Sequence, residues 1–496
     1  MKKSAILILL LIPAMALSLP AQTSTSGNFE RFRKEKRAQF EKYRHDKRTE
    51  FEQYRRKLNE EFADMMERNW KDYDPSPEQK RKEKPKPTKP LDAENTKIIS
   101  PQEIQVDVVT PPEPVIPDIP VTLPRVTPGR TADYPVTFTF YHTPCGINSF
   151  DTSVLDFSNI SSGTLASAWR RLSGHADTET LVNDCLRLRE ELNLCDWGYV
   201  KVVEAAAKKL YPASADKQAF LTVFLLNQSG YDAKLASRDG RLHVMVHPSH
   251  TLYFRSGTII SGKAYYLISQ SGKSSSAFKA CDTDFRKGAT PIRMVMNRIP
   301  AFAADKTKYR IYTSSKWQKA PPVEVKVNPS VIEFMNDYPI LDWNLYGLSQ
   351  LSPQVRSTIY AALSVIIEGM DAVEAVNTLL DYMQTGFEYM TDGNQFGYEK
   401  PFFFDENFFY PANDCEDRAI LFAEFVKSLL GLDVVYLNYP RHLATAVRLP
   451  YDVDGTYVTV DGKKYYVCDP TCINGKAGIL AAVYSASRPK VVKITE

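Results

Sequence analysis

A cysteine, a histidine and an aspartate in the C-terminal part of the chain have the types and the order of a nucleophile, its base and an orienting carboxylate. Cys415 comes directly before an apolar run with helical i, i+3, i+4 spacing, which Gly431 ends. His442 begins a strand-like run, and Asp469 ends a short apolar strand before Pro470. If these strands are neighbours, the aspartate can orient the imidazole while its other nitrogen faces the thiol.

The helix that begins near Cys415 has to position this chemistry. Asn413 or Asp414 can cap it, and the partial positive charge at its N-terminus favours a thiolate. Its first backbone N–H groups can also hold an oxyanion. Three neighbouring acids, Asp414, Glu416 and Asp417, oppose the thiolate, so a base is required. Taken singly, a buried cysteine, a structural histidine and an Asp-Pro turn are commonplace, but their order on the predicted elements favours a triad.

The segment Asp414–Ala419 (DCEDRA), followed by His442 and by Asp469–Thr471, resembles the transglutaminase-like cysteine enzymes of the papain-like superfamily. It is most similar to the bacterial transglutaminase-like cysteine peptidase branch, and the resemblance covers about the last third of the chain. It implies that Cys415 is the nucleophile, His442 the general base and then the acid, and Asp469 the orienting carboxylate.

Two departures from the family pattern leave this set intact. Tyr465 and Tyr466 stand where the family often has tryptophan, and Asp414 stands where it usually has a small residue. The resemblance implies an exported cysteine peptidase or amidase, or an acyltransferase, acting on peptide or side-chain amides through a thioester. The alternative is a catalytically inactive envelope binding or scaffold protein, because such folds also serve as binding modules.

A degenerate second copy of this module is expected over residues 136–275. The run Ala219–Gly230 is similar to Ala419–Gly431, and strand-like runs follow both. Laid over one another, the copies pair Cys415 with Ala215, His442 with His243 and Asp469 with Ser269. The second copy therefore lacks a nucleophile.

The first 21 residues have the features of a secretory signal peptide. Two lysines precede the apolar run Ala5–Leu19, and Ala21 is the expected last residue before cleavage. No cysteine follows to accept a lipid, and no later run is long and apolar enough to span a bilayer. We therefore expect a periplasmic or secreted protein without a transmembrane segment.

An aromatic pattern with a period of eleven residues predicts a helical arm over residues 22–74. The repeats begin at Phe29, Phe40, Phe51 and Phe62. Eleven residues span three helical turns, so the rings form a nearly straight stripe, as in a straight or slightly right-handed coiled coil. Such a stripe needs a partner. The sequence leaves open whether this is a second copy, the folded domains of the same chain, or another surface.

The remaining segments complete an α+β architecture. Residues 75–135 are rich in proline and predict a spacer without a core. Residues 276–328 are expected to form a connector with strands at 292–295, 309–312 and 323–327. The catalytic module is expected over residues 329–496, with helices at 352–368 and 371–387.

The composition excludes few classes of function. The 496 residues suggest several domains, and the net charge of +3 argues against nucleic acid as a partner. The expected partner is a peptide or protein substrate. The six cysteines other than Cys415 are able to pair, and a bridge between Cys468 and Cys472 would stiffen the loop at Asp469. No motif specifies a cofactor or a metal, and a need for calcium stays open.

Overall fold

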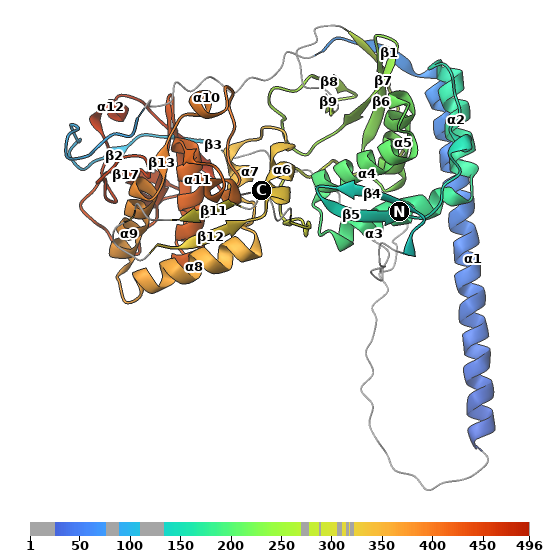
Figure 1. Ribbon diagram of the computed structural model, residues 1–496, viewed down its shortest axis with the longest axis horizontal. Coiled ribbons are helices and arrows are strands. Elements are labelled where there is room, and N and C mark those ends of the chain that lie inside the picture. Colours follow the sequence, from blue (N-terminus) through green and yellow to red (C-terminus); the bar gives the residue numbers. More distant parts are fainter. Residues whose placement is uncertain are drawn as a thin grey trace. The chain divides into compact units, whose positions relative to one another are not determined.

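The computed structural model describes residues 25–75, 89–109, 133–268, 277–286, 289–304, 310–313, 317 and 322–495. They form two compact units, one up to Leu58 and one from Asn59 onward. The fold is α+β, as the sequence predicts: a long N-terminal helix, a near-barrel antiparallel sheet and a curled mixed half-barrel sheet (Figure 1). The predicted signal peptide lies outside the described residues. Within the described ranges, no helix combines the length and apolar character that a membrane crossing requires.

The N-terminal helix α1 (Thr25–Arg68) contains the eleven-residue repeat. Exposed ion pairs at helical spacing, such as Arg31 with Glu35 at 3.4 Å, support it. The predicted helix over 22–74 is too long at its C-terminal end. Strand β1 (Trp70–Tyr73) follows the helix and pairs with β10 (Phe278–Cys281), because its backbone groups find partners in a sheet there.

The antiparallel sheet has six strands in the order β1-β10-β6-β7-β9-β8. The β6–β7 hairpin turns at Asp239 and Gly240, which both have positive φ angles, as a two-residue turn that follows the strand twist requires. Trp169 on α2 is buried against Phe62 and Phe285. The elements of this part are β4 (Val136–Phe140), β5 (Thr143–Ile147), η2 (Thr152–Val154), α2 (Ser162–Gly174), α3 (Asp177–Glu191), α4 (Asp196–Leu210), α5 (Ala215–Gln228), β6 (Ala233–Arg238), β7 (Arg241–Val246), β8 (Gly257–Ile260) and β9 (Lys263–Leu267).

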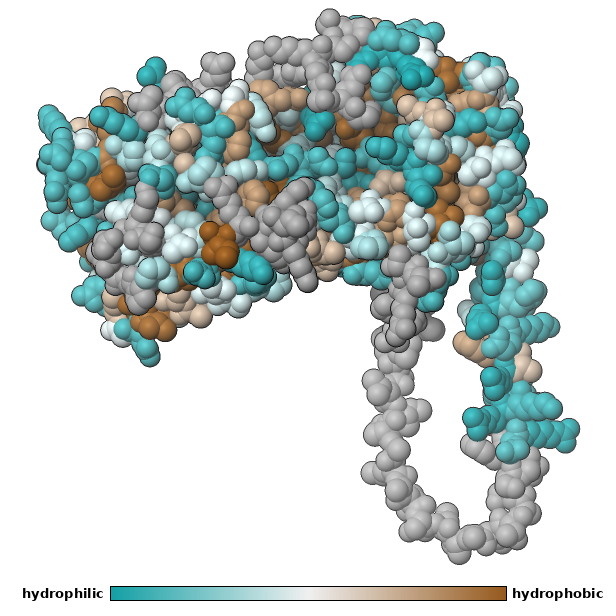
Figure 2. Space-filling view, viewed as in Figure 1, coloured by the Kyte–Doolittle hydropathy of each residue, from teal (hydrophilic) through white to brown (hydrophobic). Residues whose placement is uncertain are grey.

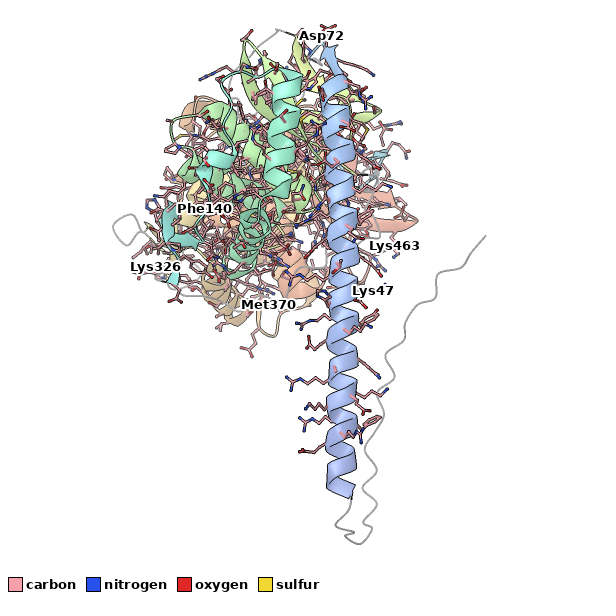
Figure 3. All side chains as sticks on the ribbon, turned by 90° about the vertical axis from the view of Figure 1, so that its right-hand side faces the viewer. Lys47, Asp72, Phe140, Lys326, Met370 and Lys463 are labelled. Carbon is pink, nitrogen blue, oxygen red and sulfur yellow. The ribbon has the colours of Figure 1, made fainter. Side chains whose placement is uncertain are left out.

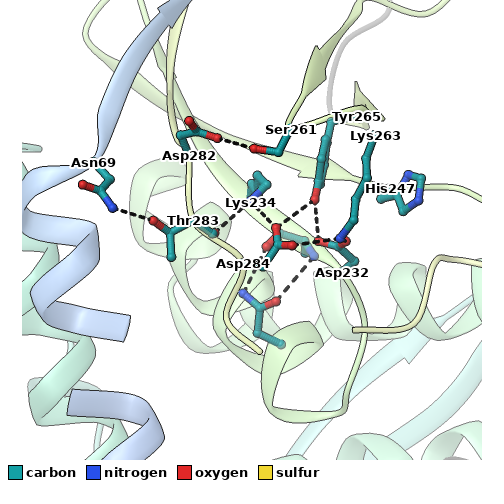
Figure 4. A network of polar contacts seen from close by, with 12 residues as sticks. Asn69, Asp232, Lys234, His247, Ser261, Lys263, Tyr265, Asp282, Thr283 and Asp284 are labelled. Atoms are coloured by element: carbon teal, nitrogen blue, oxygen red, sulfur yellow. Dashed lines mark hydrogen bonds and ion pairs between the residues drawn. The ribbon is translucent and has the colours of Figure 1, made fainter. Parts of the chain in front are cut away.

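A cluster of ion pairs joins strands β6 and β9 to the segment that follows β10 (Figure 4). Lys234 Nζ donates to Asp284 Oδ1 at 2.7 Å. Lys263 Nζ donates to both Asp232, at 2.8 Å, and Asp284, at 2.9 Å. Tyr265 donates its hydroxyl to Asp232 at 2.8 Å. Within this group two cations balance two carboxylates, so the nearly buried Lys234 and Asp232 each have an opposite charge beside them.

Acid should weaken this cluster. Burial raises the pKa of Asp284, but Lys234 and Lys263 outweigh burial and hold it at about 2. The pKa of an unfolded aspartate is about 3.9. The ion pairs therefore stabilise the fold fully above that pH, and this stabilisation is lost as the pH falls towards 2. We expect Asp284→Asn to be less stable at neutral pH and to lose less stability between about pH 4 and 2 than the parent. Urea unfolding across this range, with Asp239→Asn in the exposed turn as control, measures this; equal pH slopes for Asp284→Asn and the parent would contradict it.

The curled sheet has seven strands in the order β2-β17-β18-β16-β15-β19-β3. Its inner strands are antiparallel, while β2 (Glu103–Ile104) and β3 (Asp107–Val109) add in parallel at opposite edges. Only two residues separate β2 from β3, so their ends lie within about 11 Å of each other and the sheet has to curl. The inner strands are β15 (Val434–Tyr439), β16 (His442–Val447), β17 (Tyr457–Val460), β18 (Lys463–Cys468) and β19 (Lys490–Lys493).

The prediction of a coreless spacer over 75–135 is wrong for residues 89–109, which we call the strap. Leu91, Ile99, Ile104 and Val106 pack against the apolar core of the curled sheet. Backbone hydrogen bonds also hold the strap, for example from the Ile473 N–H to the Leu91 carbonyl at 2.8 Å. A proline-rich composition does not prevent this, because sheet edges tolerate a missing N–H. Of the rest of the predicted spacer, the structure describes only residue 75 and residues 133–135. Residues 76–88 and 110–132 lie outside the described ranges.

The two sheets share a strand order, which supports the predicted internal repeat. Strands β8-β9-β7-β6-β10 follow one another with the same antiparallel pairing as β17-β18-β16-β15-β19. In the chain, α5 precedes the first set and α11 (Cys415–Phe425) precedes the second. The predicted connector is only partly correct. Strands β11 (Arg310–Thr313) and β12 (Glu324–Val327) form, but residues 292–295 contain only an isolated bridge from Ile292 to Pro248, and β10 belongs to the first sheet.

The C-terminal part adds helices of different lengths around the curled sheet (Figure 1). Helices α8 and α9 form close to the predicted 352–368 and 371–387. The remaining elements are α6 (Pro329–Asn336), α7 (Trp343–Gly347), α8 (Pro353–Ile367), α9 (Ala372–Thr385), β13 (Glu388–Tyr389), α10 (Asp392–Gln395), η3 (Phe404–Phe408), β14 (Ala412–Asn413), η4 (Val426–Leu430) and α12 (Ala482–Ser485).

Candidate active site

Helix α11 begins at Cys415, where the sequence predicts a helix start. Asp414 precedes it in an extended conformation, and its N–H donates to Asp417 Oδ2 at 3.1 Å. The helix passes into a π-helical turn and ends at Gly431, whose φ of 65° suits a glycine. It packs against strand β16 and against helices α7 and α9. These contacts bury the whole first turn, so Cys415 is held in the interior.

His442 and Asp469 are joined directly. His442 is the first residue of β16, and Asp469 follows β18, which pairs with β16. His442 Nε2 lies 2.8 Å from Asp469 Oδ2, and Asp469 Oδ1 accepts the Thr471 N–H at 2.9 Å. The strands are therefore neighbours, as predicted, and the carboxylate fixes the direction of the imidazole.

The other imidazole nitrogen makes no hydrogen bond to the described residues. This atom, His442 Nδ1, is buried. Tyr484 on α12 stacks on the ring, with centroids 4.6 Å apart and planes 16° apart. Burial raises the pKa of Tyr484, and the charges of Asp469 and Cys415 raise it further. Tyr484 thus lies within electrostatic reach of the aspartate and the thiol while touching the histidine.

The thiol has a polar contact of its own. Cys415 Sγ donates to Glu416 Oε2 at 3.1 Å. Cys415 and His442 are both 0% exposed, and Asp469 is 5% exposed. The thiol and the imidazole are therefore closed off from solvent, and Tyr484 stacks on the imidazole.

Two positioning residues were missed by the sequence analysis. Gln384 on α9 donates to the carbonyl of Asp469 at 3.0 Å and to that of Gly475 at 2.9 Å. Arg418 donates to Asn413 Oδ1 at 2.9 Å, and burial lowers its pKa to about 10. The signal for Gln384 was present, because a polar residue on the apolar face of the predicted 371–387 helix needs internal partners.

Buried acids surround the start of α11 and are the groups that can hold a cation. Ligand atoms within 4.8 Å of one another occur in three overlapping sets drawn from Asp392, Asp414, Cys415, Glu416, Asp417 and Glu399. Carboxylate oxygens suit a hard cation such as calcium. Backbone N–H groups already satisfy part of the set: Asp417 Oδ1 accepts from Phe402 at 2.9 Å, and Asp392 Oδ2 accepts from Lys400 at 2.6 Å.

All seven cysteines, which lie in the described part of the chain, are buried thiols. The bridge between Cys468 and Cys472 that the sequence left possible is therefore not formed. Cys468 ends β18 and is 0% exposed, and its carbonyl accepts the Thr445 hydroxyl at 2.5 Å. The hydrogen bonds around Asp469 stiffen its loop instead of a disulfide.

The corresponding place in the first sheet carries different chemistry. In the β6–β7 hairpin Arg241 pairs with Arg238, just as His442 pairs with Tyr439 in β15–β16. The counterpart of His442 is therefore Arg241, and the predicted counterpart His243 is two residues further along the strand.

Helix α5 begins at Ala215, the predicted counterpart of Cys415, while Ser269 lies outside the described residues. A cavity of about 560 Å³ opens here, lined by residues that include Lys208, Ala215, Asp216, Arg241 and His243. No cysteine is among the residues that line this cavity, whereas Cys415 stands at the start of the corresponding helix α11.

Comparison of the chain with models of protein families, with curated proteins and with solved structures found no match.

Proposed function

We propose that this chain is an exported cysteine peptidase or amidase of transglutaminase-like type, acting from the C-terminal module. The observation that carries the proposal is the state of His442. Asp469 holds its Nε2 at 2.8 Å, and its buried Nδ1 remains without a hydrogen-bond partner among the described residues. This orientation of His442, on a strand packed against the helix that begins with Cys415, supports a role for the imidazole as general base.

The reaction follows from these positions. His442 Nδ1 takes the proton of Cys415, and Sγ attacks the carbonyl carbon of an amide. The first N–H groups of α11 stabilise the oxyanion of the tetrahedral intermediate. His442 then donates the proton to the leaving amine, which leaves a thioester on Cys415. Water, activated by the same imidazole, releases the acid and restores the thiol.

The competing proposal is a binding or scaffold protein with an inactive triad. The complete burial of Cys415 and His442 and the hydrogen bond from Cys415 to Glu416 favour it. In that case the C-terminal module would bind a partner without turnover, as the first sheet, which has Ala215 and Arg241 at the corresponding places, would also do.

Hydrolysis is expected to exceed amine transfer. Transfer requires a site that holds the acceptor and excludes water, and no stretch of sequence beside the three residues specifies such a site. The purified chain would be incubated under reducing conditions with a glutamine-containing peptide and a labelled primary amine, with calcium in one arm and a chelator in the other. Mass spectrometry should show mainly free acid. Predominant amine conjugate would overturn the hydrolytic proposal, and no product in either arm would favour the binding protein.

A further inference from the structure

The aromatic stripe of α1 is exposed over three repeats and buried in the fourth. Exposed fractions are 55% for Phe32, 60% for Phe40, 61% for Phe51 and 62% for Tyr54. Phe62, at the same place in the next repeat, is 3% exposed, and its ring lies 4.6 Å from that of Trp169. The fourth repeat of the stripe therefore packs against apolar side chains of the folded part. Over residues 25–58, an apolar partner for the stripe has to come from outside the described part of this chain.

The surface beside the stripe is strongly polar. Figure 2 shows a mainly hydrophilic helix surface interrupted by small apolar patches, and Figure 3 shows side chains radiating from α1 around Lys47. A stripe this narrow is the seam of a helix pair rather than the wide apolar face of a helix lying in a membrane surface.

Over the first two repeats, the charges on the two sides of the stripe have opposite signs. At about 100° per residue, the fifth and ninth positions of each repeat lie on one side, and the seventh and eleventh lie on the other. The first side carries Arg33, Arg37, Arg44 and Arg48, of which Arg44 and Arg48 also pair with Glu41 and Glu52 of the same helix. The second side carries Glu35, Gln39, Asp46 and Glu50 in these two repeats, and Lys57 reverses its sign in the third.

This asymmetry selects one partner and one direction. When two identical helices pair in parallel, each side of the seam faces the opposite side of the partner, so arginines face acids. In an antiparallel pair each side faces its own copy, and arginines face arginines. We propose that residues 25–58 of α1 form a parallel, in-register coiled coil with the same segment of a second copy of this chain.

Lysines in the seam limit the strength of the pair. Lys36 lies over the Phe32 ring at 5.5 Å, and Lys47 lies over the Tyr43 ring at 5.9 Å. Their position in the repeat is occupied by Leu58 one repeat later. In the parallel pair each lysine meets its own copy, which weakens association but penalises shifted registers. The dimer should therefore be reversible and in the micromolar range.

Sedimentation of the full chain tests the pairing. The parent should show a concentration-dependent monomer–dimer equilibrium. Phe40→Glu with Phe51→Glu should give a monomer, because both rings are exposed and their loss does not affect folding. Thr49→Glu, on the face opposite the stripe, adds charge without touching the seam and should stay dimeric. Lys36→Leu with Lys47→Leu should tighten the dimer at least about tenfold. A parent that is monomeric at all concentrations overturns the proposal.

Cross-linking tests the direction. Separate Lys36→Cys and Lys47→Cys variants should each form a covalent dimer efficiently with a short bismaleimide, since each residue meets its own copy. A mixture of the two should give little mixed product. The antiparallel alignment that best superimposes the aromatic rings instead brings residue 36 against residue 47. Preferential mixed product would therefore overturn the parallel arrangement. Amide hydrolysis by the Phe40→Glu, Phe51→Glu variant is measured in parallel and should be unchanged.

Discussion

Replacing Cys415 with alanine is expected to abolish amide hydrolysis, lowering kcat by at least about 10⁴-fold, because no other group at the site can form the thioester. The substitution removes one sulfur atom from a buried position at the start of α11. It should therefore leave circular dichroism and the unfolding transition nearly unchanged. Product formation would be followed by mass spectrometry with the same peptide for parent and variant.

The chain offers a matched control. Cys472 is also buried and lies three residues after Asp469, so Cys472→Ala makes the same truncation near the site without removing the nucleophile. It should keep activity within a few-fold of the parent. Equal activity of Cys415→Ala and Cys472→Ala would disprove the thioester mechanism.

Selective alkylation provides an independent measurement of the same thiol. Burial raises the pKa of Cys145 and Cys185 to about 12 and that of Cys281 to about 11, so these groups stay protonated at pH 8. A brief iodoacetamide treatment should label Cys415 first, at the rate at which this buried site opens to solvent. Uniform labelling of several cysteines would count against a specially activated nucleophile.

A charge placed on the buried side of the strap should strongly lower the stability of the C-terminal module. Ile104 on β2 packs against the core of the curled sheet, so Ile104→Asp places a carboxylate in an apolar surrounding. We expect the free energy of unfolding of the C-terminal module to fall by about 2–4 kcal/mol. Chemical denaturation followed by the near-ultraviolet signal of tyrosine would measure it. Val108→Asp is the control, because Val108 lies in the same segment but is 43% exposed. If both substitutions cost the same, the strap does not contribute to that core.

Several elements follow from local pattern alone. Spacing, caps and breakers predict the α1 repeat, the helix that begins at Cys415 and helices α8 and α9. They also predict the strand that begins at His442 and the strand that ends just before Asp469. The reason is that helix and strand periodicity are local properties of the side chains. Local pattern gave the wrong prediction where the pairing partner is distant in the sequence. Helix α1 ends earlier than predicted because β1 pairs with β10. The strap pairs with both edges of a sheet whose strands lie some 350 residues later in the chain.

The candidate site divides in the same way. The sequence by itself determined the identity and order of Cys415, His442 and Asp469 and the elements that carry them. Only the tertiary structure decided that Asp469 holds Nε2 rather than Nδ1, that Tyr484 covers the imidazole, and that Gln384 holds the loop of Asp469. It also decided that Arg241, and not His243, occupies the place of His442 in the first sheet. These facts depend on strand register and on contacts between distant segments, and neither is encoded in the spacing of neighbouring residues.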